Sequence, residues 1–478
     1  MVYGLIISIY LFGFVGAVST LLLAVSFTKS QRRKFPILKR LGGRQQLYLL
    51  ICAILSSLLT GGANAWKECL TIRVPLELVQ GPSGETTPKA TIAGLERELE
   101  EAAAERVSEA RDYFKVAERD FAARRYRDAA TIYQKSIDVL STMSGYLNLG
   151  LSLFFVSDLQ RAQDAFISGL QVARKKRNNE FEAAFLNNIG LVYADQGKLE
   201  AALKSYQKAL EIDKEIGNRL GQANALGNIG NVHFRQGRLE KALNSHQEAL
   251  EIDKEIRHSR GHAHDLNNIG NVYFSQGKLE EALRYYEEAL RIYQQIDHDR
   301  GKAIALGNIG TVYFCQGKLE EALTSHQEAL EIDKQIGDSL SQANDLNNIG
   351  NGYFGQVKLE EALRYYEEAL RIYQQIDHRA GHADSLNNIG NIHYRQGKLE
   401  AALKSYEEAL TIYQQIGHER GKVIALGNIN NVYSRQGKRP GSLQLLRQAR
   451  VIYLKIGIRT MGSRTVEEMI ERDSSPSE

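Results

Sequence analysis

Apolar and polar positions along most of the chain repeat with a period of forty residues. The tripeptide Asn-Ile-Gly recurs at that step at 188–190, 228–230, 268–270, 308–310, 348–350 and 388–390, with Asn-Ile-Asn at 428–430. An earlier copy, Asn-Leu-Gly at 148–150, keeps the same step. Because a fixed period of about 20–50 residues is typical of repeat architectures, the sequence predicts an array of similar units.

Each unit is predicted to contain two helices. One face of the first helix carries residues at i, i+3, i+4 and i+7, for example Leu226, Ile229, Gly230 and His233. Gly237 is expected to end this helix in a left-handed conformation, and the second helix is expected from about Leu239 to Ile256. A hairpin of this size cannot bury its apolar face alone, so neighbouring units must stack into a solenoid.

Composition supports an all-α fold for this stretch. No proline lies between Pro88 and Pro440, and proline is the residue that helix interiors tolerate least. Some segments also repeat with a period of eighty residues. For example, the sequence of Ser245–Asp253 recurs in the segment that begins at Ser325. This longer period indicates that pairs of units were duplicated together.

Net charge carries information about topology. The chain has a formal net charge of +3, but residues 1–65 contain seven Lys and Arg and no Asp or Glu, which leaves −4 for the remainder. A slightly acidic body gives no support for nucleic acid as a partner.

The first 65 residues are typical of a membrane or export segment. Met1–Phe27 has no charged residue and is long enough to span a hydrocarbon core of about 30 Å. A basic segment follows, and then a second apolar run, Leu47–Thr60. The small residues around Ala65 are typical of a signal-peptide cleavage site.

Two interpretations of this segment are open. In one, Met1–Phe27 is a transmembrane helix, Leu47–Trp66 is a marginal second one, and the basic loop stays cytoplasmic. In the other, the chain starts near Leu38 and the residues up to Ala65 are a cleaved secretory signal. Both place the repeat body on the non-cytoplasmic side, either membrane-anchored or secreted or periplasmic. A chance hydrophobic N-terminus on a cytoplasmic protein is the less favoured alternative.

These patterns divide the chain into five parts. Residues 1–65 are the transmembrane or signal region, 66–90 a linker, 91–108 a lead-in helix, 109–460 about nine repeat units, and 461–478 a capping helix with a disordered tail.

The unit resembles the tetratricopeptide repeat (TPR). The family pattern of Leu, Gly, Tyr, Ala, aromatic and Ala is carried here by Leu266, Gly270, Tyr273, Ala282, Tyr286 and Ala289. The resemblance implies a right-handed superhelix. Units of forty residues exceed the family length of about 34, and the extra residues are expected to extend the second helix and add a polar connector such as 297–301. This long variety is similar to the repeats of G-protein signalling modulators and kinesin light chains, which bind extended peptide segments.

The resemblance also implies that the first helix of each unit lines a concave groove. Two rows of asparagines fall on these helices, the first at Asn188, Asn228, Asn268, Asn308, Asn348, Asn388 and Asn428, and the second at Asn231, Asn271, Asn351, Asn391 and Asn431. A carboxamide offers both a donor and an acceptor, so these rows are expected to bind the backbone of a peptide. For the first row, the alternative is hydrogen bonding to the neighbouring unit.

Other features of the units are expected to be structural. An aromatic row at Phe234, Phe274, Phe314, Phe354 and Tyr394 is predicted to pack between units, with groove lining as the alternative. The positions that hold a carboxylate clamp in chaperone-binding relatives carry Asn or Gly here, so no chain-terminal carboxylate is expected as ligand. The histidines at 258, 262 and 264 are interpreted as a polar connector rather than a metal site.

One unit departs from the pattern. Gly352 lies inside its first helix, and Val357 stands where the turn glycine is expected. Glycine costs about 1 kcal/mol in a helix interior and valine is poor at positive φ, so a local weak point is predicted there.

The sequence therefore predicts a non-catalytic protein-binding scaffold that captures extended peptide segments. No nucleophile–base pair stands out, so neither enzymatic activity, nor a cofactor, nor a small-molecule substrate is expected. A receptor for a small signalling peptide is the alternative function.

Overall fold

The computed structural model describes residues 104–438, 444–445, 447–449 and 451–452. The chain divides into two compact units, 1–65 and 66–478, and all described residues belong to the second. The predicted membrane or signal region, the linker, residues 91–103 of the lead-in helix and the tail at 461–478 lie outside the described residues.

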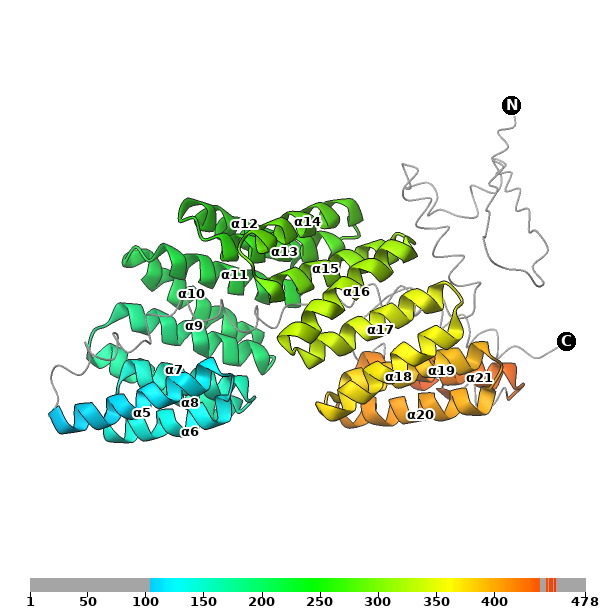
Figure 1. The fold of residues 1–478 in the computed structure, drawn as a ribbon, viewed down its shortest axis with the longest axis horizontal. Helices are drawn as coiled ribbons and strands as arrows, with labels where there is room; N and C mark the ends of the chain where they lie inside the picture. The colour runs from blue at the N-terminus through cyan, green and yellow to red at the C-terminus, as the bar shows by residue number, and fades with distance from the viewer. Residues whose placement is uncertain (1–103, 439–443, 446, 450, 453–478) are drawn as a thin grey trace, which may run out of the picture. The chain divides into compact units, whose positions relative to one another are not determined.

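Helices are the only regular secondary structure within the described part of the chain, which confirms the all-α prediction. They are labelled in Figure 1. Their bounds are α5 (Ala104–Ala122), α6 (Tyr126–Val139), α7 (Met143–Phe155), α8 (Leu159–Lys175), α9 (Asn179–Asp195), α10 (Leu199–Glu215), α11 (Arg219–Arg235), α12 (Leu239–Glu255), α13 (Ser259–Ser275), α14 (Leu279–Gln295), α15 (Asp299–Cys315), α16 (Leu319–Ile336), α17 (Ser339–Gly355), α18 (Leu359–Gln375), α19 (Arg379–Arg395), α20 (Leu399–Gln415) and α21 (Glu419–Arg435).

Consecutive helices pair as antiparallel hairpins, and each hairpin stacks on the next. Every even-numbered helix contacts the odd-numbered helix before it and the one after it. Eight hairpins, from α5–α6 to α19–α20, are described and are followed by α21. The predicted solenoid is confirmed. The total of about nine units and the right-handed superhelix stay predictions, the former because the segment after α21 is described only in part.

The predicted helix faces form the core between neighbouring helices. On α11 the buried face includes Leu226, Ile229, Gly230 and His233, as predicted. On α12, Ala242 and Ala249 are fully buried, and the small side chains let the helices pack closely. The helix ends at Glu255, one residue before the predicted end.

A residue with positive φ separates the two helices of each unit. Gly237 has φ 72°, and glycines at the equivalent positions of five other units adopt φ between 72° and 76°. Val357 takes the same place with φ 63°, a conformation that costs a β-branched residue free energy. The strained geometry at Val357 is therefore confirmed, whereas the weak point itself stays a prediction.

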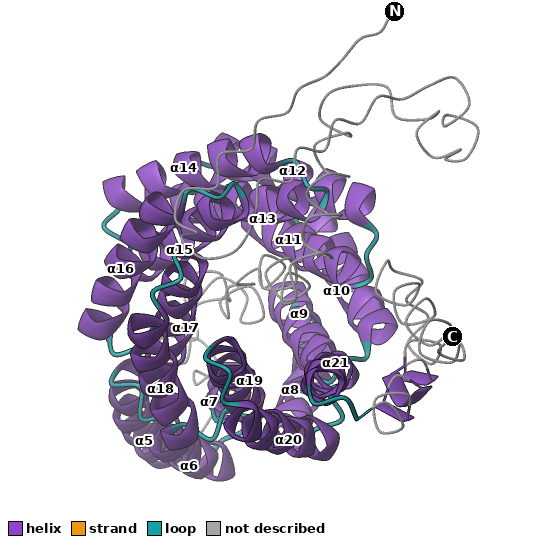
Figure 2. Cartoon of the chain, turned by 90° about the vertical axis from the view of Figure 1, so that its right-hand side faces the viewer, coloured by secondary structure: helices purple, strands orange, loops and turns teal. Residues whose placement is uncertain are grey.

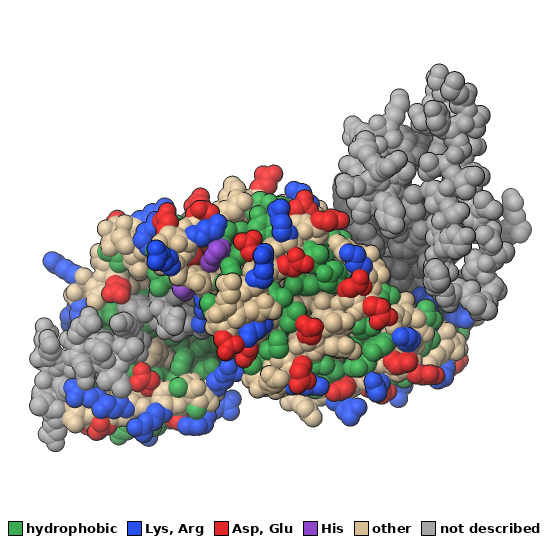
Figure 3. Space-filling model, turned by 45° about the horizontal axis from the view of Figure 1, so that its top comes forward, with side chains coloured by type: hydrophobic (Ala, Val, Ile, Leu, Met, Phe, Trp, Pro, Cys, Tyr) green, Lys and Arg blue, Asp and Glu red, His purple; other side chains and the backbone are tan. Residues whose placement is uncertain are grey.

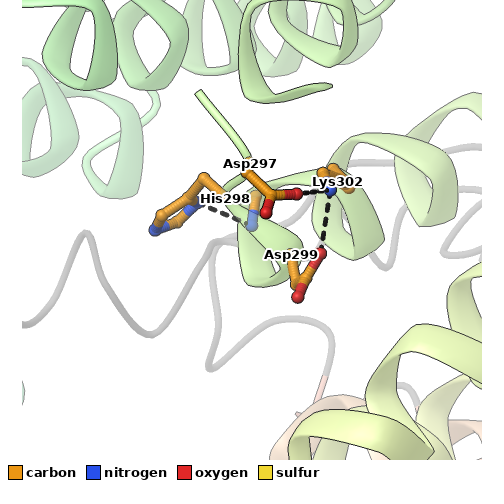
Figure 4. A network of polar contacts seen from close by, with 5 residues as sticks. Asp297, His298, Asp299 and Lys302 are labelled. Atoms are coloured by element: carbon orange, nitrogen blue, oxygen red, sulfur yellow. Dashed lines mark hydrogen bonds and ion pairs between the residues drawn. The ribbon is translucent and has the colours of Figure 1, made fainter. Parts of the chain in front are cut away.

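The link between units is shorter than the sequence predicted. Residues 297–301 were expected to form a polar connector, but α15 already begins at Asp299. His298 is the N-cap, and its Nδ1 accepts a hydrogen bond from the backbone N–H of Gly301 at 2.9 Å. Lys302 Nζ donates to the carboxylates of Asp297 at 2.7 Å and Asp299 at 2.9 Å (Figure 4). This cap starts α15 earlier than predicted. The residues by which the unit exceeds the family length of about 34 therefore lengthen both helices, and α14 and α15 have 17 residues each.

The stack presents two kinds of surface. Odd-numbered helices from α7 to α21 also contact the next odd-numbered helix, so they form one continuous layer, and the even-numbered helices form the other (Figure 2). On the face drawn in Figure 3, acidic and basic side chains are interspersed, in keeping with the small net charge of the body. Among the described helices, none is both long and apolar enough to cross a bilayer.

Candidate functional site

All predicted site residues lie on odd-numbered helices that contact one another. We call the side formed by α9, α11, α13, α15, α17, α19 and α21 the odd-helix surface. The structure thus brings the two asparagine rows onto one layer of adjacent helices (Figure 2). Their role in peptide binding stays a prediction, but the structure defines the hydrogen bonds of most of these amides.

Most amides of the first row are bonded to the preceding unit. Nδ2 of Asn228 donates to Oδ1 of Asn187, 41 residues earlier, at 3.0 Å. The same bond joins Asn308 to Asn267 at 3.1 Å, Asn388 to Asn347 at 3.2 Å, and Asn428 to Asn387 at 2.9 Å. At these four positions, the alternative of hydrogen bonding between units is confirmed.

The other three members of the first row do not make this bond. Asn188 donates to the carbonyl oxygen of Ala184 in its own helix at 2.8 Å. For Asn268 and Asn348, the residue 41 positions earlier is a glycine, so there is no carboxamide to receive the bond. Both polar atoms of Asn268 are buried without a hydrogen-bond partner.

Three members of the second row are oriented by tyrosines of the even-numbered helices. The Tyr286 hydroxyl donates to Oδ1 of Asn271 at 2.8 Å, and equivalent bonds join Tyr366 to Asn351 at 2.6 Å and Tyr406 to Asn391 at 2.8 Å. Burial raises the pKa of Tyr286 and of Tyr406, so the hydroxyls keep the proton that they donate. Because each Oδ1 is occupied by a donor, the N–H groups of these three amides remain for an acceptor elsewhere.

Glycines of the first helices receive the aromatic rings of the second helices. A Cβ at Gly270 would lie 2.6 Å from the ring of Tyr286, and one at Gly230 would lie 2.7 Å from Nε2 of His246. The expectation that Gly230 permits close approach of the partner helix is therefore confirmed. The same contact recurs at the pairs Gly190–Tyr206, Gly310–His326, Gly350–Tyr366 and Gly390–Tyr406.

Two buried histidine–aspartate pairs lie between units, and sequence reasoning did not identify them. Nδ1 of His246 on α12 lies 3.2 Å from Oδ1 of Asp265 on α13, and Nδ1 of His326 lies 3.4 Å from Oδ1 of Asp345. Burial lowers the pKa of His246 to about 3 and raises the pKa of Asp265. Since both charged forms are disfavoured, the pair acts as a structural hydrogen bond.

The sequence contains a pattern that would have predicted these pairs, because two positions 19 residues apart change together between units. Where the second helix carries His, the residue 19 positions later is Asp. Where it carries Tyr, that residue is Ala or Ser, as in Tyr206 with Ala225, Tyr286 with Ala305, Tyr366 with Ser385 and Tyr406 with Ala425. Comparison of units at this spacing would have shown that the two positions change together.

The histidines near 260 have separate partners. Nδ1 of His258 lies 3.1 Å from Oδ1 of Asp253, and the ring of His264 lies edge-on to Tyr293 with centroids 5.6 Å apart. Burial lowers the pKa of His262. In the part of the chain that the structure describes, no group of three or more His, Cys, Asp or Glu is arranged to hold a metal ion.

Aromatic residues of the predicted packing row lie between units. Phe274 is buried in a cluster with residues of the next unit, including Ile309 and Val312. The guanidinium of Arg395 lies 5.5 Å from the ring centroid of Phe354, and that of Arg435 lies 5.2 Å from the centroid of Tyr394. Packing between units is thus confirmed for these three aromatic residues.

The fold and these repeated contacts define a solenoid of helical hairpins. The family model of the tetratricopeptide repeat matches residues 141–215, 181–255, 221–295, 263–335, 301–375 and 381–455, which together make up more than half of the chain. The chain therefore belongs to the tetratricopeptide repeat family, as its sequence indicated.

Two solved structures share the fold at low sequence identity. The apo form of the quorum sensor NprR from B. thuringiensis is 18% identical, with a TM-score of 0.55 over 72% of this chain and 97% of that one. Aspartyl phosphate phosphatase F from Bacillus subtilis is 11% identical, with a TM-score of 0.51 over 76% and 96%. Comparison with curated protein sequences gives no match.

Proposed function

We propose that this protein is a non-catalytic scaffold whose odd-helix surface binds an extended segment of a protein partner. Membership of a repeat family that binds proteins and peptides supports the general class of function. The observation that carries the specific proposal is the second asparagine row. Its amides at Asn271, Asn351 and Asn391 have their oxygens held by tyrosine hydroxyls.

This arrangement suits a peptide backbone. Each residue of an extended segment offers a carbonyl oxygen, and the N–H groups of the second row supply donors on several units of the array. An amide that is fixed by a buried hydroxyl loses little further rotational freedom when it binds, which favours affinity. Because backbone carbonyls are common to all sequences, such contacts give affinity with little side-chain selectivity.

The test uses the full chain and a displayed library of random twelve-residue peptides. One variant replaces Asn231, Asn271, Asn351 and Asn391 by Ala, and its matched control replaces Tyr286, Tyr366 and Tyr406 by Phe. The control removes the supporting hydroxyls but keeps the amides. We expect the alanine variant to retain its helical circular dichroism and to lose peptide capture. The phenylalanine control should keep most of the wild-type peptide capture. Equal capture by the wild type and the alanine variant would refute the assignment.

The proposal also includes a location. The basic segment and two apolar runs within residues 1–65 favour a repeat body on the non-cytoplasmic side of a membrane, anchored or exported. Mass spectrometry of the mature N-terminus decides between these outcomes. A chain that begins at Trp66 indicates export, and a retained Met1 in the membrane fraction indicates anchoring. A retained Met1 in the cytosolic fraction would contradict the proposed location.

A sensor for a small signalling peptide is the second candidate. The observation that favours it is the fold shared with the quorum sensor NprR. Peptide length separates the two functions. A sensor reaches its full affinity with a peptide of a few residues, whereas a scaffold with donors on several units gains affinity as the peptide lengthens.

A further inference from the structure

We call the series of Asn–Asn hydrogen bonds between neighbouring units along the first row the ladder. This ladder is interrupted at specific positions. Between α9 and α11, a carboxamide at Asn187 receives the bond from Asn228. Between α11 and α13, the equivalent of Asn187 is Gly227, and Asn268 lacks that partner. The next boundary is closed again, by Asn267 and Asn308. Closed and open positions therefore alternate here with the period of two units.

The open position has both room and an unsatisfied partner. A Cβ added to Gly227 would have one heavy atom within 4 Å, Oδ1 of Asp265 at 3.5 Å, which is an ordinary van der Waals distance. Asn268 is 3% exposed, and neither Oδ1 nor Nδ2 of its amide has a hydrogen-bond partner. Since the great majority of buried polar groups in proteins are paired, this amide lacks a partner that the closed positions have. Its two polar atoms are covered by neighbouring side chains, so a partner group that enters beside Gly227 reaches them only when those side chains move.

We propose that the open position at Gly227 and Asn268 binds the side-chain carboxamide of an Asn or Gln in the partner segment. This inference rests on the proposed function and adds side-chain selectivity to it. The chain itself shows which group fits, because a carboxamide occupies the equivalent place at four boundaries of the array. A carboxamide also supplies the donor and the acceptor that Oδ1 and Nδ2 of Asn268 require.

A second boundary with the same pair of residue types sets a spacing for the partner. Gly307 stands opposite Asn348, two units after Gly227 and Asn268. Packed helices lie about 8–10 Å apart, so the two positions are separated by roughly 16–20 Å. An extended chain advances about 3.3 Å per residue, and this span corresponds to about five or six residues. A segment with two Asn or Gln residues at that spacing reaches both positions.

Two substitutions test the proposal. One fills the open position with a carboxamide, and the other removes the amide of Asn268. Gly227→Asn supplies the missing carboxamide, closes the ladder and is expected to raise the melting temperature. Asn268→Leu removes the amide and keeps a similar side-chain volume. Gly427→Asn is the matched control, because no heavy atom lies within 4 Å of a Cβ added there and the residue 41 positions later is not Asn.

The assay is selection from the random twelve-residue library with the full-length variants. We expect the wild type and Gly427→Asn to enrich peptides that carry Asn or Gln, in pairs five or six residues apart. Gly227→Asn and Asn268→Leu should abolish the enrichment of such pairs and weaken the selected peptides by about tenfold, the effect of losing one hydrogen-bonded group. Binding without any enrichment of Asn or Gln, or an enrichment of pairs that survives both variants, would overturn the inference but leave the proposed function in place. A wild type that selects no peptides would overturn both.

Discussion

Exchanging His246 and Asp265 for the pair used elsewhere in the array tests whether these residues form one structural unit. Three other unit boundaries carry Tyr and Ala at the equivalent positions. The experiment therefore compares His246→Tyr, Asp265→Ala and the double variant with the wild type. Because the double variant copies a solution that this chain already uses, it is expected to fold with nearly the wild-type stability.

The structure sets the size of each effect. His246 is 1% exposed and Asp265 is 5% exposed, with 3.2 Å between Nδ1 and Oδ1. Asp265→Ala leaves a buried imidazole nitrogen unpaired, which costs about 1–3 kcal/mol. His246→Tyr adds volume beside Gly230 and Asp265, which costs about 1–3 kcal/mol from overpacking, and it leaves the carboxyl group unpaired. The double variant removes both of these costs, so the coupling free energy should approach the sum of the two single effects, at least about 2 kcal/mol.

Local stability is the quantity to measure, because repeat arrays unfold in parts and their stability depends on neighbouring interfaces. Hydrogen exchange over α12 and α13 reports the opening free energy at this boundary, with thermal unfolding of the full chain as a second measurement. The equivalent cycle at His326 and Asp345 provides an internal replicate. We expect protection to fall in each single variant and to return in the double variant.

Additive single effects, within about 0.5 kcal/mol, would refute the reasoning that the two residues are coupled. Salt gives a further check. Burial disfavours the charged forms of both His246 and Asp265, and the pair has no net charge to screen. The coupling should therefore change little between low and high ionic strength, and a strong decrease in salt would indicate an exposed ion pair instead.

Three further predictions follow from single positions. Val357→Gly should stabilise the fold by about 1 kcal/mol, because it relieves the positive φ, and should slow hydrogen exchange at that turn. Gly270→Ala should destabilise by about 1–3 kcal/mol, because its Cβ would clash with the buried ring of Tyr286, whereas Gly427→Ala should be neutral or stabilising in the same thermal melts. Burial raises the pKa of Asp213 to about 6 from the ordinary 3.8, so the folded chain retains a proton that the unfolded chain loses between these values, and stability falls as the pH rises through that window. Asp213→Asn should therefore stabilise more at pH 7 than at pH 4, and an equal gain at both would contradict this origin.

Much of the fold follows from the sequence because its determinants are local. The forty-residue period, the buried face of α11 and the left-handed Gly237 all follow from spacing and from glycine's conformational freedom. The connector at 297–301 was predicted wrongly, because the cap that His298 provides is a hydrogen bond to a specific backbone N–H, which helix periodicity does not reveal.

The hydrogen-bond partners of the asparagine rows could not be predicted from local sequence patterns. Helix periodicity alone places these amides on one face of the first helices. Only the stacking of units decided that Asn228 bonds to Asn187, that Tyr286 holds Asn271, and that Asn268 is left without a partner. The physical reason is that helix periodicity fixes the direction of a side chain relative to its own helix. The group that it meets depends on how the next unit packs, and that is a property of the tertiary structure alone.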